Sequence, residues 1–168
     1  MDISDLLVDA FGRVRATTHH VVDGLTAEVL AYRPSPEANS IAWLIWHLTR
    51  IQDDHVADVA GREQIWTAAG WMDRFGLPFS AAATGYGHLP DDVAAVTVES
   101  GELLLGYHDA VHAATTRYVE GLVADDLDRI VDERWDPPVS LGVRLVSVLA
   151  DDLQHVGQAA YLRGLVAP

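Results

Sequence analysis

Apolar residues recur three and four positions apart in four stretches of the chain, the spacing that places them on one side of a helix. The first stretch covers about residues 2–30 and includes Leu7 and Phe11. Pro34 and Pro36 follow it, and a helix seldom continues through proline. The pattern therefore predicts one long amphipathic helix at the start of the chain.

The second stretch begins after Asn39 or Ser40, which are both good N-cap residues, and runs to about Ala60 before Gly61. Residues 62–90 follow with weak periodicity and several glycines and prolines. A connection of this length without regular structure is uncommon in a compact domain. We therefore expect residues 62–90 to be functional or partly helical.

The third stretch starts near Pro90 and runs to about Gly121, and the fourth starts after Ser140 and runs to about Arg163. No segment shows the alternating pattern and flanking turns of a hairpin strand. Long helices joined by prolines and loops are typical of antiparallel bundles. The sequence predicts an all-α, antiparallel four-helix bundle in one domain over residues 1–168, with a long connection between the second and third helices.

The formal net charge of −14 narrows the range of partners. Nucleic acids and anionic membranes attract basic surfaces, so we expect no nucleic acid and no membrane as partner. No apolar run approaches the length of a membrane span, and the N-terminus lacks the pattern of a signal peptide, so we expect a cytoplasmic protein. The chain has no cysteine, so a thiol used in its chemistry must arrive as a small molecule.

The fourth helix carries the strongest chemical signal. Asp151 and His155 stand four positions apart, so their side chains project from one face of this helix. A carboxylate and an imidazole at this spacing can chelate one divalent ion. Both residues fall at the edge of the apolar stripe, where a carboxylate is costly unless it is paired or bound to metal. A surface ion pair is the alternative interpretation.

His47 is the third candidate ligand, because it lies about two turns into the strongly apolar second helix. A hydrogen-bonded core histidine is the alternative. His55 is a rival, since it falls in the centre of the apolar stripe and, by helical angle, closer to the core than His47. Asp152 is a second rival, which could replace Asp151 as the buried carboxylate or anchor His155.

Two further features of the helices need an explanation. His108 and His112 stand four positions apart on the third helix, so they could chelate an ion or form a solvated or packing pair. Gly157 lies inside the fourth helix, where glycine costs about 1 kcal/mol relative to alanine. The close approach of another helix or of a ligand would explain this glycine.

Two motifs occur together in this chain. Residues 39–44, Asn-Ser-Ile-Ala-Trp-Leu, lead into the helix that carries His47, and Asp151 stands four residues before the His-Val-Gly-Gln segment that begins at His155. This combination resembles the DinB-like superfamily, which includes mycothiol-dependent maleylpyruvate isomerases and related thiol transferases. The resemblance spans most of the chain. It implies a DinB-like bundle that holds one metal ion through His47, Asp151 and His155.

One position departs from the commoner pattern of that superfamily. The first residue of the last-helix pair is usually His, but here it is Asp151. The mycothiol-dependent isomerase branch has Glu there, which is one methylene longer than Asp. Two imidazoles and a carboxylate suit Zn²⁺, Ni²⁺ or Fe²⁺ about equally well. The aromatic residues Trp43, Trp46, Trp71 and Tyr161 could line a pocket above the metal, with plain core packing as the alternative.

The resemblance also implies a function. It suggests a metal-dependent transferase or isomerase that acts on a small-molecule substrate with mycothiol or a similar thiol as cosubstrate, and it suggests a homodimer. It assigns no catalytic residue beyond the metal ligands. The alternative is a DinB-like protein without turnover, related to stress, that binds a metal or a small ligand.

Overall fold

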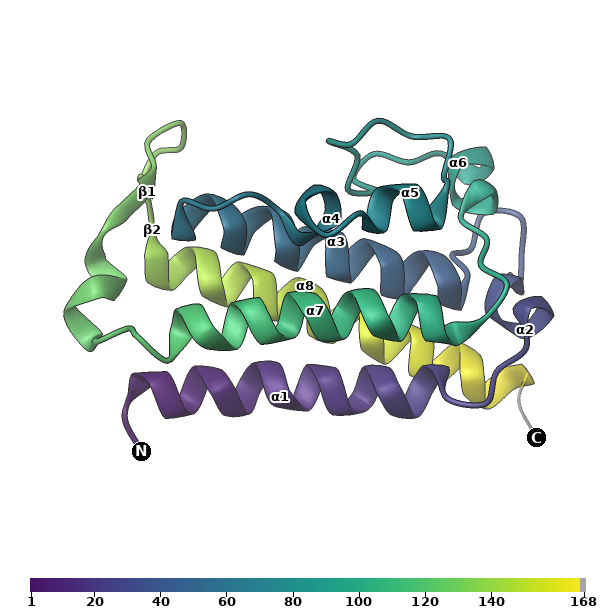
Figure 1. The fold of residues 1–168 in the computed structure, drawn as a ribbon, viewed down its shortest axis with the longest axis horizontal. Coiled ribbons are helices and arrows are strands. Elements are labelled where there is room, and N and C mark those ends of the chain that lie inside the picture. The colour runs from purple at the N-terminus through teal and green to yellow at the C-terminus, as the bar shows by residue number, and fades with distance from the viewer. Residues whose placement is uncertain (167–168) are drawn as a thin grey trace.

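Four long helices lie side by side in the computed structural model, which describes residues 1–166 (Figure 1). They are α1 (Ile3–Val22), α3 (Ile41–Ala60), α7 (Gly101–Val119) and α8 (Leu141–Val166). α3 packs against α7 and α8, and α1 packs against the same two helices on the other side of the bundle. The predicted all-α four-helix bundle is confirmed. Among the described residues, no helix combines the length and the apolar character of a membrane span.

The directions of the four helices depend on the long connection. α3 and α8 run antiparallel, as do α1 and α7 (Figure 1). Two hydrogen-bonded contacts show that α3 and α7 run parallel. Thr49 of α3 contacts His108 of α7, and Gln52, further along α3, contacts Thr115, further along α7. A parallel pair requires the chain to return along the bundle between the two helices. Residues 61–100 make this return.

Shorter elements occupy the segments between the long helices. They are α2 (Ala27–Ala31), α4 (Ile65–Ala68), α5 (Trp71–Phe75), α6 (Pro90–Ala95), the 3-10 helix η1 (Ala124–Asp128), and the strands β1 (Ile130–Asp132) and β2 (Val139–Ser140). The expectation that the long connection is partly helical is confirmed by α4 and α5. The expectation of no strands was wrong, since β1 and β2 pair as an antiparallel hairpin. Strands this short are too brief to show an alternating pattern.

Two predicted helices are each divided in the structure. The first ends at Val22, because Gly24 has a positive φ of 73° and turns the chain before α2 begins. The third is interrupted between α6 and α7, where Ser100 caps α7 by accepting from the backbone N–H of Glu102. Apolar residues continue through both breaks, so the periodicity alone does not reveal them.

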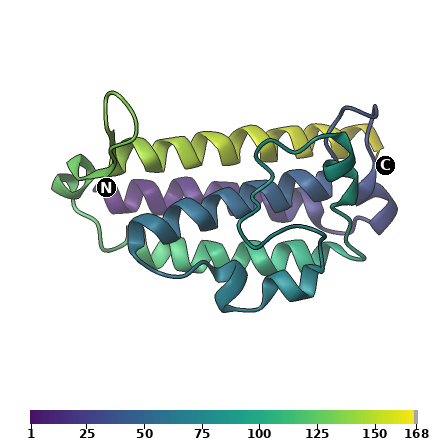
Figure 2. The same ribbon diagram turned by 90° about the horizontal axis from the view of Figure 1, so that it is seen from above.

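The first half of α3 is buried on all sides, with every residue from Ile41 to Arg50 in the interior. The bundle covers one side of this half, and the connection crosses over the other side (Figure 2). Arg50 donates hydrogen bonds to the carbonyl groups of Ala81 and Ala83. These bonds fasten the connection over α3 and so position the site described below.

Candidate metal site

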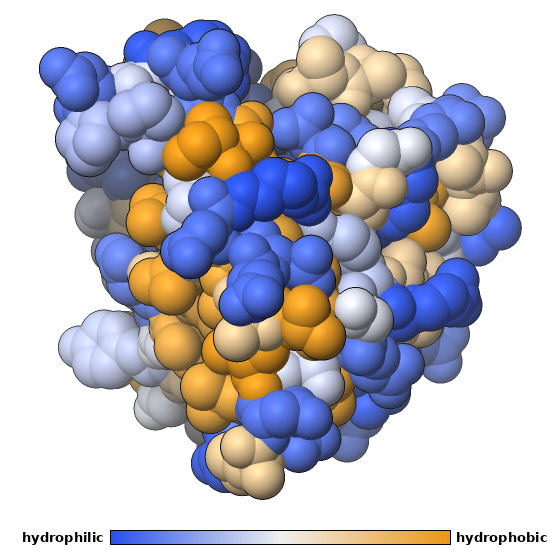
Figure 3. All heavy atoms as spheres, turned by 90° about the vertical axis from the view of Figure 1, so that its left-hand side faces the viewer, coloured by the Kyte–Doolittle hydropathy of each residue, from blue (hydrophilic) through white to orange (hydrophobic). Residues whose placement is uncertain are grey.

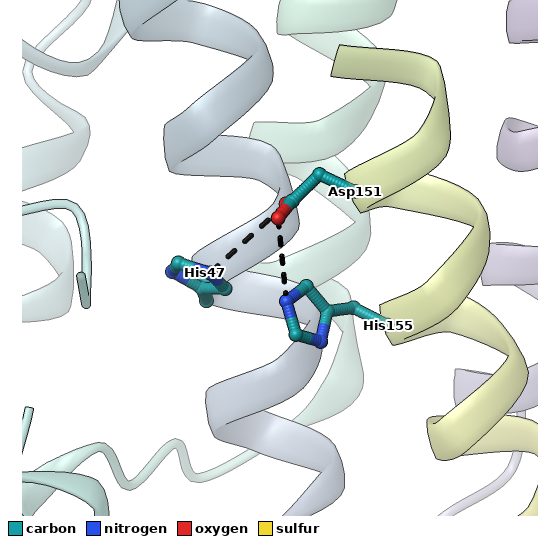
Figure 4. Close-up of side chains that lie close together, drawn as sticks. All are labelled: His47, Asp151 and His155. Atoms are coloured by element: carbon teal, nitrogen blue, oxygen red, sulfur yellow. Dashed lines mark ion pairs between the residues drawn. The ribbon is translucent and has the colours of Figure 1, made fainter. Parts of the chain in front are cut away.

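His47 on α3 and Asp151 and His155 on α8 point toward one another across the contact between the two helices (Figure 4). Each offers one ligand atom, and the three atoms lie within 4.8 Å of one another. His47 Nε2 is 4.0 Å from Asp151 Oδ2, and His155 Nε2 is 3.5 Å from Asp151 Oδ1. Asp151 and His155 meet because four residues make about one helical turn. We call these three residues the His/Asp/His group.

Hydrogen bonds at the other ring nitrogens orient both imidazoles. His47 Nδ1 lies 2.5 Å from the carbonyl oxygen of Thr84, which can only accept, so Nδ1 carries the proton. His155 Nδ1 lies 3.1 Å from Oε1 of Gln158 and donates to it in the same way. Each neutral ring therefore presents an unprotonated Nε2 to the group, as metal-binding histidines do.

The His/Asp/His group lacks a donor that satisfies all of its acceptors. Asp151 Oδ2 is buried and has no hydrogen-bond partner among the described residues. An unpaired buried acceptor costs about 1–3 kcal/mol. A second proton on the His155 ring, at Nε2, would pair only with Oδ1 of Asp151, 3.5 Å away, and would leave Oδ2 without a partner. A divalent cation pairs with all three residues at once, so the donor set and its geometry fit a metal ion.

The spacing of the ligand atoms also fits. A tetrahedral ion with bonds of about 2.1 Å holds its ligand atoms about 3.4 Å apart. Nε2 of His155 lies close to this value, at 3.5 Å from Oδ1 of Asp151, and Nε2 of His47 lies further out, at 4.0 Å from Oδ2 of Asp151. The three ligand atoms, which lie within 4.8 Å of one another, would draw together around an ion. Three protein ligands leave a fourth position open, which is typical of catalytic rather than structural sites. The side chain of Asp151 is 32% exposed, so a small molecule can reach the group from that side.

Burial and charge shift the pKa values of the two histidines in opposite directions. Burial lowers the pKa of His47, and the hydrogen bond to Thr84 offsets this only in part, so the ring is neutral at pH 7. Burial also acts against the charged form of His155, but hydrogen bonds to Asp151 and Gln158 prevail and raise the pKa of this ring. A proton on His155 therefore competes with a cation for the same lone pair.

The connection supplies a contact that the sequence did not indicate. Gly85 has a φ of 96°, and a Cβ atom built there would lie 2.6 Å from Nδ1 of His47. Glycine lets the backbone pass this close to the ring while the carbonyl of Thr84 accepts its proton. Gly85 and Gly87 indicate a turn in the sequence, but they do not reveal which side chain the turn contacts.

The rival His55 lies outside the His/Asp/His group. Its side chain is 31% exposed, against 6% for His47, so the prediction that His55 lies nearer the core was wrong. The reason is that the connection covers the first half of α3, whereas the periodicity reports only how α3 faces the bundle. His55 Nδ1 instead lies 3.2 Å from Nη1 of Arg144.

The rival Asp152 is fully buried on the neighbouring side of α8. Burial, and then the charge of Asp151, raises the pKa of the Asp152 carboxyl well above its ordinary value. Its oxygens have no hydrogen-bond partner within residues 1–166, so it does not anchor His155 through a hydrogen bond. His108 is also buried, and its Nδ1 lies 3.0 Å from Oγ1 of Thr49.

The aromatic candidates divide between the site and the core. Trp43 stacks on His47, with 4.5 Å between the ring centroids. Trp46 is 1% exposed and packs in the core of the bundle. Trp71 packs against the same core, beside Tyr107, and Tyr161 is 69% exposed on α8. The structure thus places Trp43 as a wall of the His/Asp/His group.

A four-helix bundle with a long connection after its second long helix, and with this side-chain group between α3 and α8, defines a DinB-like protein. Residues 6–168 match the family model described as mycothiol S-transferase, and the chain therefore belongs to the mycothiol S-transferase family. The resemblance stated from the sequence motifs is confirmed.

Similar chains add evidence on the fold. The crystal structure of a conserved protein from Enterococcus faecalis is 30% identical to this chain, with a TM-score of 0.92. The match covers 99% of this chain and 98% of that one. No curated protein matches the chain.

Proposed function

We propose that this chain is a metal-dependent S-transferase that uses mycothiol or a similar small thiol as cosubstrate. The observation that carries the proposal is the meeting of three acceptor atoms, from His47, Asp151 and His155, without a donor to pair them all. Membership of the mycothiol S-transferase family supports the thiol. The chain has no cysteine, so the nucleophilic sulfur comes from the cosubstrate.

The residues around the group have distinct parts in this chemistry. A divalent ion, whether Zn²⁺, Ni²⁺ or Fe²⁺, lowers the pKa of a thiol that coordinates it and makes the sulfur nucleophilic near neutral pH. Thr84 holds the imidazole of His47 in the ligating tautomer, and Gln158 does so for His155. Trp43 covers one face of His47 and keeps water away from it. The partly exposed Asp151 marks the side from which a cosubstrate approaches.

A transfer assay tests this function. Mycothiol is mixed with a haloalkyl dye, so that the sulfur–carbon bond forms, halide leaves and the thiol proton passes to solvent. We expect the metal-loaded protein to accelerate this reaction, and we expect His47→Ala and His155→Ala to lose both metal and acceleration. His20→Ala, at an exposed position of α1, is the matched control that keeps both. A metal-loaded protein that gives no acceleration would support the alternative, a DinB-like protein that binds metal without turnover.

The proposal includes a homodimer, which the outer face of α8 supports. The exposed residues of α8 all lack charge: Val143, Val146, Ser147, Ala150, Leu153, Gln154, Gly157, Gln158, Tyr161, Gly164 and Leu165. The exposed residues of α1 include Asp5, Asp9 and Arg13. Apolar atoms also gather on the end of the molecule where α8 begins (Figure 3). Two copies of a chain with a net charge of −14 repel each other, so an uncharged face is where they can meet.

Gly157 lies in the middle of this uncharged face of α8. Among the described residues, no atom lies within 4 Å of a Cβ built at Gly157, so the chain itself does not supply the close approach that this glycine led us to expect. A second copy of α8 would supply it. Sedimentation velocity tests the dimer: Leu153→Glu should give a monomer, whereas Tyr86→Glu, at a residue that is 90% exposed elsewhere, should leave the dimer intact. A monomeric wild type would contradict this part of the proposal.

A further inference from the structure

A cavity of about 600 Å³ lies between the second half of α3, the start of the connection, the β1–β2 hairpin and the start of α8. A cavity of this volume is large enough for a small-molecule ligand. Its lining carries three carboxylates and three guanidinium groups: Asp54, Asp58, Glu63, Arg62, Arg134 and Arg144. The charges of the lining therefore balance.

The cavity and the His/Asp/His group share one face of each of two helices. His47 and Asp54 stand seven residues apart on α3, and the same spacing separates Asp151 from Arg144 on α8. Seven residues make two helical turns, so each pair lies on one side of its helix, about 10 Å apart along the axis. Residues 81–84 form a second link, because this segment lines the cavity where it begins and contacts His47 where it ends.

Arg62 brings unused hydrogen-bond donors to the cavity. Its Nη1 donates to the carbonyl of Glu63 and lies 3.6 Å from Asp53 Oδ1. Its Nε and Nη2 are buried and have no hydrogen-bond partner within the described part of the chain. Unpaired buried donors are uncommon and costly in folded proteins. A hydroxyl or carbonyl oxygen of a ligand in the cavity would pair with them.

The opposite wall of the cavity offers acceptors. Asp54 accepts a hydrogen bond from Gln64 at Oδ1, at 2.7 Å, and its side chain is 37% exposed. Its remaining lone pairs are therefore free to accept from a hydroxyl or an amide. Asp132 holds Arg144 in place with a contact of 2.9 Å. The lining carries equal numbers of carboxylates and guanidinium groups, so it favours a ligand without net charge that offers both donors and acceptors, as hydroxyl and amide groups do.

We propose that this cavity binds the body of the thiol cosubstrate, and that this body is an uncharged group rich in hydroxyl and amide functions. The sulfur then extends along the α3–α8 contact for about 10 Å to reach His47, Asp151 and His155. The destination of the sulfur rests on the proposed function, but the binding of the body does not. Arg62 and Asp54 are the residues that recognise the body.

The experiment measures the binding of S-methyl mycothiol by isothermal titration calorimetry, with metal-free and metal-loaded full-length protein. The methyl group blocks the sulfur, so this probe reports on the body of the thiol alone. We expect Arg62→Gln and Asp54→Asn each to weaken binding by about tenfold, which corresponds to the loss of one good hydrogen bond. Arg13→Gln, on the exposed side of α1, is the matched control and should bind as the wild type does. S-methyl glutathione, which carries a net negative charge, should bind the wild type at least about tenfold more weakly.

Metal content, measured on the same samples, separates this inference from the proposed function. Both cavity variants should keep the metal content of the wild type, because neither residue belongs to the His/Asp/His group. Binding of the probe that is unchanged in both variants, or no binding to the wild type, would overturn the cavity assignment while leaving the metal site standing. A wild type without metal that still loses probe binding in both variants would support the cavity and remove the proposed function. Because Arg62 also neighbours Asp53, thermal melting checks its fold, and Asp54→Asn tests the cavity independently.

Discussion

α3 contributes residues to two polar groups, and the two groups differ in how their atoms are paired. Around Asp53, the carboxylate accepts hydrogen bonds from the backbone N–H groups of Ile65 and Trp66 and from the hydroxyl of Tyr107, at 2.8–3.0 Å. Arg50 completes this network through its bonds to the connection. In the His/Asp/His group, two imidazole nitrogens and a carboxylate face one another without a donor to pair them all.

The difference indicates that the Asp53 network and the His/Asp/His group have different roles. The paired network near Asp53 holds α4 and the connection against α3, so it belongs to the architecture. The unpaired group costs free energy in the absence of a cation, and a purely structural role does not explain its cost.

The largest expected effect is on stability, at Asp53. We expect Asp53→Ala to lower the free energy of unfolding by about 3–5 kcal/mol, because it leaves the buried guanidinium of Arg50 without its neighbouring charge, 3.8 Å away, and two backbone N–H groups without an acceptor. Urea denaturation measures this change. Asp58→Ala, at an exposed position of the same helix, should change stability by less than about 0.5 kcal/mol. Equal effects of the two substitutions would show that the paired network is not what fastens the connection.

The next effect is on metal affinity, at Gly85. We expect Gly85→Ala to weaken metal binding by about 10–100-fold, because the new Cβ displaces either the ring of His47 or the Thr84 carbonyl that orients it. Gly87→Ala is a close control, since Gly87 also has a positive φ, of 77°, but nothing lies within 4 Å of its Cβ position. Competition with a metal-binding dye gives both affinities. If both variants lose the same affinity, backbone strain and not contact with His47 is the cause.

The smallest expected effect is the pH dependence of stability at His108, which is fully buried with its Nδ1 beside Thr49. Complete burial, and then the neighbouring His112, lowers the pKa of His108 from 6.5 to about 3. As the pH falls, His108 therefore takes up a proton in the unfolded chain before it does so in the folded chain. The stability that the neutral, buried His108 contributes is fully present above pH 6.5 and is lost progressively toward pH 3. The expected slope is about 1.4 kcal/mol per pH unit.

Urea denaturation at pH 7, 6 and 5 measures that slope. His108→Gln keeps a polar group beside Thr49 but does not titrate in this range, so its stability should fall less steeply with acid than that of the wild type. Parallel slopes for the two proteins would show that His108 takes up its proton in the folded state.

The sequence predicted the four long helices because each buries a continuous apolar stripe. It did not predict the break after Val22 or the one before Ser100, since apolar residues continue through both turns. It also missed β1 and β2, which are held by pairing with each other and by packing against α8, not by a pattern of their own. Local periodicity reports which side of an element is buried, but not where a turn redirects the chain.

The candidate site was predictable only in part for the same reason. The spacing of Asp151 and His155 places both on one face of a helix, whereas the pairing of His47 with them required the family resemblance. The angular position of each residue around α3 predicted that His55 would be more buried than His47. That prediction could not take into account the connection, which covers the first half of α3. The contact of Thr84 with His47 joins residues 37 positions apart through irregular backbone, and no local pattern encodes it.

The most direct test of the account is metal content by plasma mass spectrometry, on protein purified without a His tag and then dialysed against Zn²⁺, Ni²⁺ or Fe²⁺. Asp151→Asn is the informative variant, because it removes the charge between the two imidazoles with almost no change in size. We expect about one metal ion per wild-type chain and a loss of most of it in Asp151→Asn, with little change in the stability of the metal-free protein. A wild type that stays free of metal, or a variant that binds metal as the wild type does, would contradict the central claim.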